Sequence, residues 1–129
     1  MNSIENKKKS ILVRACDPVM TQQASKTIPP QIGEPEYVAT TSDDDFVDKL
    51  NSRDWSVIFF APRACRLNEA SQPIPGSNAK TQGWTLEQYR ELVYETQGNG
   101  VQIVEAQEER ETVGLLKKAL AKARETSFD

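Results

Sequence analysis

The feature that most constrains the fold is an unbroken apolar run, Val57 to Ala61, within the segment WSVIFFAPRACR. Its residues do not alternate with polar ones, as they would in a strand with one face in water. A strand that helices cover on both faces has this continuous pattern. Pro62 then removes a backbone donor and predicts the end of the strand. The run therefore predicts a central strand, at 56–61, in a sheet with helices on both sides.

Short apolar runs alternate with amphipathic segments along the rest of the chain. Further strands are predicted at 10–15, 36–40 and 101–105, and helices at about 18–26, 43–50, 85–97 and 108–125. Gly98 is expected to end the third helix, and Lys117, Lys118 and Lys122 are expected to stay in solvent on the last one. This alternation and the right-handed crossover rule predict an α/β fold, a three-layer doubly wound sheet with four parallel strands in order 2-1-3-4, flavodoxin-like. Residues 10–126 are expected to form the single domain, after a flexible lead-in at 1–9 and before a tail at 127–129.

Composition excludes several kinds of site. The chain of 129 residues has no histidine, which excludes Ser-His and Cys-His nucleophile pairs and histidine-ligated metals. Its two cysteines cannot supply a four-thiolate zinc site. Asp43, Asp44 and Asp45 open a predicted helix, where carboxylates favour the helix dipole, so they are interpreted as capping residues. No metal and no cofactor are predicted.

Charge and hydropathy limit the classes of partner and the cellular compartment that the sequence predicts. A net charge of −3 does not favour binding to nucleic acid. No apolar stretch approaches the 18 or more residues of a membrane helix, so no membrane association is predicted. The polar N-terminal segment has no secretory apolar region. The sequence therefore predicts a soluble, cytoplasmic protein with both thiols free.

A functional site is expected at the carboxyl edge of the sheet, between the first and third strands, where the strand order reverses. Cys16 lies at the end of the first strand, just before a predicted helix. Helix amides and nearby arginines would lower the pKa of its thiol and make it a nucleophile. The alternative interpretation is a small, half-buried apolar side chain without a chemical role. Arg63 and Arg66 follow the third strand and would hold a phosphate or carboxylate, or they are ordinary surface arginines. Cys65 is a candidate redox partner for Cys16.

A long polar connection, LNEASQPIPGSNAKTQG, follows the third strand and is either functional or mobile. Two functions remain open. One is a regulatory or partner-binding module without catalysis, which contacts a protein partner through the 67–84 loop. The alternative is a cysteine-based phosphocarrier or small enzyme that acts on a small anionic ligand through Cys16.

The pattern of the chain resembles the IIB components of the lactose/cellobiose class of sugar phosphotransferase systems. Cys16 stands where that family has its phosphorylated cysteine, WSVIFFAP resembles its third strand, and VQIVEAQ with the helix that follows resembles its end. In the family, the loop after the cysteine is rich in Gly, Ser and Thr and cradles the phosphate, whereas this chain has DPVM at 17–20. The resemblance therefore implies the flavodoxin-like fold rather than the activity.

Overall fold

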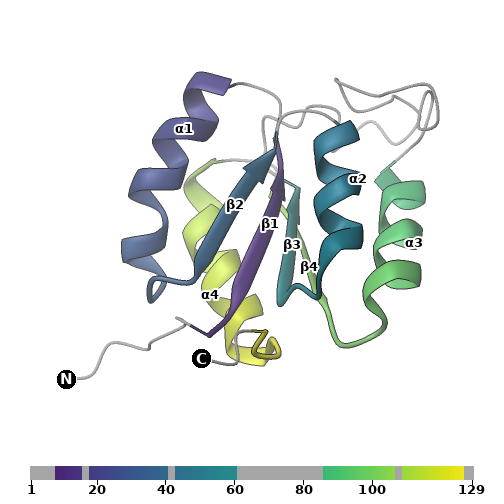
Figure 1. The fold of residues 1–129 in the computed structure, drawn as a ribbon. Coiled ribbons are helices and arrows are strands. Elements are labelled where there is room, and N and C mark those ends of the chain that lie inside the picture. The colour runs from purple at the N-terminus through teal and green to yellow at the C-terminus, as the bar shows by residue number, and fades with distance from the viewer. Residues whose placement is uncertain (1–7, 16–17, 41–42, 61–85, 107–108, 127–129) are drawn as a thin grey trace.

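The protein's structure, a computed structural model, describes residues 8–15, 18–40, 43–60, 86–106 and 109–126. Four strands pair in parallel in the order β2-β1-β3-β4 (Figure 1). The elements are β1 (Ser10–Arg14), α1 (Pro18–Thr27), β2 (Glu36–Thr40), α2 (Asp43–Ser52), β3 (Val57–Phe60), α3 (Leu86–Gln97), β4 (Gln102–Glu105) and α4 (Thr112–Lys122). The predicted four-stranded parallel sheet, its strand order and the flavodoxin-like arrangement are confirmed.

Two helices cover each face of the sheet, α1 and α4 on one side and α2 and α3 on the other (Figure 1). Side chains of successive strand residues point to opposite faces, so each strand contributes to two cores. Ile11, Val57 and Val104 pack with Leu116 and Leu120 of α4 in one core. The other core holds residues of β1 and β3 with those of α2 and α3: Leu12, Phe46, Leu50, Trp55, Ile58, Phe60, Tyr89, Val93 and Val101.

β1 and β3 are the inner strands, and every residue in them is buried. The strand predicted at 56–61 is β3, which the structure bounds at Val57 and Phe60. Phe60 lies in the core under α2 and α3, where its ring packs against Phe46 and Tyr89. The ring centroids of these two residues lie 5.8 and 6.3 Å from that of Phe60. The continuous apolar run therefore has the physical cause that its pattern predicts, burial on both faces.

The last helix is shorter than its apolar pattern predicts. The segment predicted as helix from 108 to 125 has a 3₁₀ turn at Glu109–Glu111, and α4 ends at Lys122. Ala123 is extended, with φ −80° and ψ 151°. The chain leaves the helix because its next residues are held elsewhere: Arg124 donates to the carbonyl oxygen of Trp55, and the Thr126 amide donates to that of Lys8.

A buried amide joins three parts of the chain at the amino edge of the sheet. Gln97, the last residue of α3, accepts hydrogen bonds through Oε1 from the Trp55 amide at 2.6 Å and from Arg124 Nη2 at 2.9 Å. Its Nε2 donates to the carbonyl oxygens of Leu50 and Arg53 at 2.8 and 2.9 Å. One side chain thus forms hydrogen bonds with backbone groups at the end of α2 and just before β3, and with the Arg124 side chain after α4. Gly98 then turns the chain with φ +78°, a conformation that favours glycine.

Replacing Gln97 by Met keeps the size of the side chain and removes all four hydrogen bonds. Because polar groups of the protein are then left buried without a partner, we expect the free energy of unfolding in urea to fall by about 2–4 kcal/mol. Glu95→Gln, on an exposed position of the same helix, is the control and should stay within about 0.5 kcal/mol of the parent. A loss below about 1 kcal/mol for Gln97→Met would contradict this account.

Candidate functional site

The carboxyl ends of β1 and β3 lie side by side, because these strands pair from Ile11–Val57 to Arg14–Phe60. The point where the strand order reverses is therefore at this edge, as the sequence predicts. The predicted site residues Cys16, Arg63, Cys65 and Arg66 all lie outside the described residues, and so does the 67–84 loop. Their roles stay predictions.

A buried cation that the sequence reasoning did not single out ends β1 at the same edge. Arg14 is fully buried, and its Nη1 donates a hydrogen bond to the carbonyl oxygen of Ala15. Taking a guanidinium out of water costs several kcal/mol, so a buried arginine in an inner strand destabilises the fold unless other interactions offset this cost. The signal in the sequence is an arginine inside the apolar run SILVRA.

A groove of about 540 Å³ runs along the outer edge of β4. Within the described sheet β4 stands last and pairs with β3 alone. The Gln102 amide donates to the carbonyl oxygen of Ser56, just before β3, at 3.1 Å, and the Ala106 amide donates to that of Phe60, the last residue of β3, at 3.3 Å. Backbone groups of successive strand residues point to opposite edges, so the N–H and C=O groups of Ile103 and Glu105 point away from β3 and into the groove.

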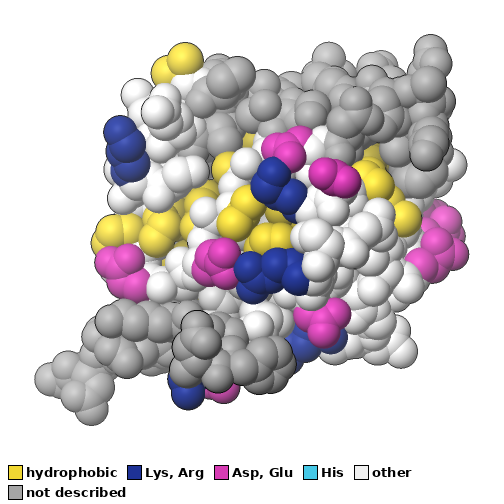
Figure 2. Space-filling model, viewed as in Figure 1, with side chains coloured by type: hydrophobic (Ala, Val, Ile, Leu, Met, Phe, Trp, Pro, Cys, Tyr) yellow, Lys and Arg dark blue, Asp and Glu magenta, His cyan; other side chains and the backbone are white. Residues whose placement is uncertain are grey.

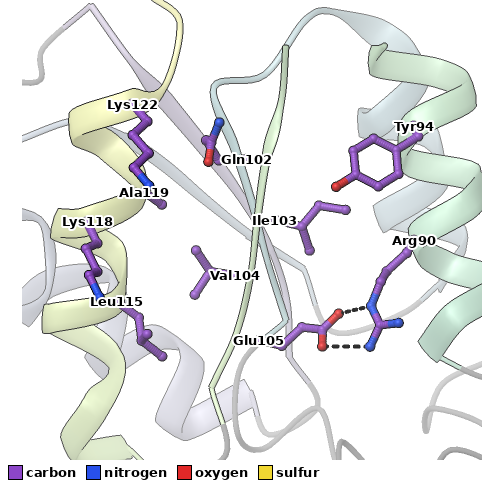
Figure 3. A pocket seen from close by; sticks show the side chains of 10 residues that line it. All are labelled: Arg90, Tyr94, Gln102, Ile103, Val104, Glu105, Leu115, Lys118, Ala119 and Lys122. Carbon is purple, nitrogen blue, oxygen red and sulfur yellow. Dashed lines mark hydrogen bonds and ion pairs between the residues drawn. The ribbon is translucent and has the colours of Figure 1, made fainter. Parts of the chain in front are cut away.

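The walls of the groove come from α3 and α4, and β4 forms its floor (Figure 3). The side chain of Val104 points towards Leu115 of α4, whereas Ile103 points towards Tyr94 of α3 (Figure 3). The floor is thus a strand edge with a helix on each side. An additional strand at the usual spacing of about 4.8 Å would lie between the two walls.

An ion pair stands where the floor meets the α3 wall. Arg90 donates to both carboxylate oxygens of Glu105, with Nη2 to Oε1 at 2.8 Å (Figure 3). The hydrogen bond with Glu105 is the main cause that raises the pKa of Arg90 above its ordinary value. This guanidinium is therefore charged and already matched by a carboxylate.

The α4 wall is cationic. Lys118 and Lys122 are exposed, and neither has an ion pair or hydrogen bond within the part of the chain that the structure describes. The groove thus holds three cations and one carboxylate, in a chain whose net charge is −3. Elsewhere opposite charges are interspersed, as in the Lys49–Asp45 and Arg53–Glu36 pairs, and Figure 2 shows both signs side by side on one face.

Sequence reasoning correctly kept Lys118 and Lys122 in solvent on the last helix, but it did not connect them with a groove. Two signals were available. The strand order 2-1-3-4 leaves the fourth strand at an edge. The i, i+4 spacing of the two lysines also places them on one side of α4.

No helix in the described ranges is long and apolar enough to cross a bilayer. No group of three or more Cys, Asp and Glu side chains gathers there in a way that would hold a metal ion.

Comparison with protein-family models, with curated proteins and with solved structures finds no match to this chain.

The Arg90–Glu105 pair should shape the groove more than it stabilises the fold. Its side chains are 41% and 25% exposed, so solvent screens their attraction. We expect a double-mutant cycle with Arg90→Gln and Glu105→Gln, measured by urea unfolding, to give a coupling of about 0.3–1 kcal/mol that shrinks as salt is added. A coupling above about 2 kcal/mol, or one indifferent to salt, would contradict this assignment.

Proposed function

We propose that the protein is a partner-binding module that receives an extended segment of another protein along the outer edge of β4, which pairs with no further strand among the described residues. What supports this proposal most is the position of the outward N–H and C=O groups of Ile103 and Glu105, on the floor of a groove with a helix on each side. Edge strands bind extended peptides in this way, with backbone hydrogen bonds for affinity and side-chain pockets for specificity.

The topology supports the same function. Flavodoxin-like sheets commonly have the strand order 2-1-3-4-5, in which a fifth strand pairs with the fourth. The sheet described here has the order 2-1-3-4, and the groove lies where a fifth strand would pair.

Ile103→Pro tests the use of this edge. Proline removes the outward amide of residue 103 and leaves the alternate amides that bond to β3, an arrangement that edge strands tolerate. The probe is a library of random heptapeptides displayed on phage, selected on the parent protein. We expect synthetic copies of the selected peptides to bind Ile103→Pro at least about tenfold more weakly, by fluorescence polarisation.

Ile103→Ala is the matched control, because it trims the same side chain and keeps the amide. It should retain binding within about threefold, and circular dichroism should show both variants folded. Alternate N-methylation of the peptides gives an independent reading: methyl groups on the amides of one edge should abolish binding, and those of the other edge should not. Selected peptides that bind Ile103→Pro as well as the parent, or a selection that enriches none, would refute the proposed function.

A second candidate function has one specific observation in its favour, the buried guanidinium of Arg14. A cation at the carboxyl end of β1 suits a site for negative charge, and Cys16 follows two residues later in the chain. We therefore retain, as a second proposal, a phosphocarrier or small enzyme that acts on an anionic ligand through the Cys16 thiolate.

Alkylation distinguishes this second function. In a Cys65→Ser background, Cys16 is the sole thiol, so iodoacetamide reports on it alone. A catalytic Cys16 should react within minutes near neutral pH, faster than a free thiol of ordinary pKa, and inorganic phosphate should protect it. A thiol that reacts only after denaturation would rule out this function.

A further inference from the structure

We infer that the segment bound along β4 is acidic at alternate positions, with carboxylates towards α4 and apolar residues towards α3. This inference rests on the proposed function and names the chemistry of its partner. It follows from the two walls of the groove, which differ in charge and in polarity.

The α4 wall matches two carboxylates on one face of a strand. Lys118 and Lys122 are one helical turn apart, which separates them by about 6 Å along the helix. Residues at i and i+2 of an extended strand lie about 6.6–6.8 Å apart on the same face. Two acidic side chains with one residue between them therefore have the spacing of the two ammonium groups.

The α3 wall suits an apolar side chain. Tyr94 is 45% exposed there, and Ile103, half-buried, points towards it from the floor (Figure 3). Arg90 already has the Glu105 carboxylate, so a further negative charge on this side would meet Glu105 without a free cation. The residue between the two carboxylates is therefore expected to be apolar, and its contact with Tyr94 adds apolar burial.

Charge also argues against a second copy of this chain in the groove. Two β4 strands that pair in antiparallel fashion about a twofold axis normal to the sheet bring both α4 helices to the same face. Lys118 and Lys122 of each copy would then lie across the joint from two further lysines. This arrangement places four like charges together, whereas an acidic segment neutralises the two that are present.

Three synthetic peptides of equal length test the inference by fluorescence polarisation. TEVEVET has the proposed alternation, TEEVVET has the same composition without paired i, i+2 carboxylates, and TKVKVKT reverses the charge. We expect TEVEVET to bind, TEEVVET to bind at least about fivefold more weakly, and TKVKVKT not to bind. The affinity for TEVEVET should fall as salt rises from about 0.05 to about 0.5 M, because salt screens the attraction between exposed charges.

Variants of α4 locate the recognition. Reversal of both charges, in Lys118→Glu with Lys122→Glu, should weaken TEVEVET by about tenfold or more, because two attractions become repulsions. Lys117→Glu is the matched control, since Lys117 is exposed on the same helix but does not line the groove, and it should change affinity less than twofold. Urea unfolding of each variant checks that the fold is kept.

The outcomes separate this inference from the proposed function. If library-selected peptides need the Ile103 amide but TEVEVET binds no better than TKVKVKT, the acidic pattern is refuted and edge binding stands. If the Lys117 control loses as much affinity as the double variant, the recognition is only bulk charge and the inference fails. If sedimentation velocity detects a dimer of the unliganded protein that Ile103→Pro dissolves, the occupant is a second copy instead.

Discussion

The structure depends on the burial of two neighbouring strands on both faces. No residue of β1 or β3 is exposed, so each strand must have a helical layer above and below it. This requirement splits the apolar residues into two cores, one under α4 and one under α2 and α3. Once the inner pair is covered, the parts of the described sheet left for contacts with other molecules are the outer edges of β2 and β4 and the ends of the strands. The groove is found at one of these edges.

Much of the fold could be predicted from local sequence because local and tertiary requirements agree over most of the chain. The run at 57–61, the alternation of elements and the Gly98 turn each have one simple physical cause. The end of α4 could not be predicted in this way, because Arg124 and Thr126 leave the helical pattern to bind groups more than sixty residues away. A helical stripe contains no information about such distant partners.

The candidate sites were harder to predict for a related reason. The groove exists because no further strand of the described sheet pairs with the outer edge of β4. A hydrophobic pattern predicts where a strand lies but does not indicate which of its edges lacks a partner. Lys118 and Lys122 were predicted to be exposed, and they are, but their use depends on the neighbouring strand edge. Arg14 was overlooked because one cation in an apolar run does not alter the strand prediction. Cys16, Arg63, Cys65 and Arg66 remain predictions from sequence, since they lie outside the described residues.

The hydrogen bonds at the amino edge have a topological consequence. The Thr126 amide donates to the Lys8 carbonyl oxygen at 2.7 Å, and the Thr126 hydroxyl hydrogen-bonds with that of Ser10. The chain thus enters and leaves the fold at nearly the same point. A polypeptide with this closure can be spliced into a loop of a host protein, or circularly permuted with new termini at an exposed turn such as 98–100, without a change in the sheet. The β4 groove would go with it, since none of its walls includes the junction.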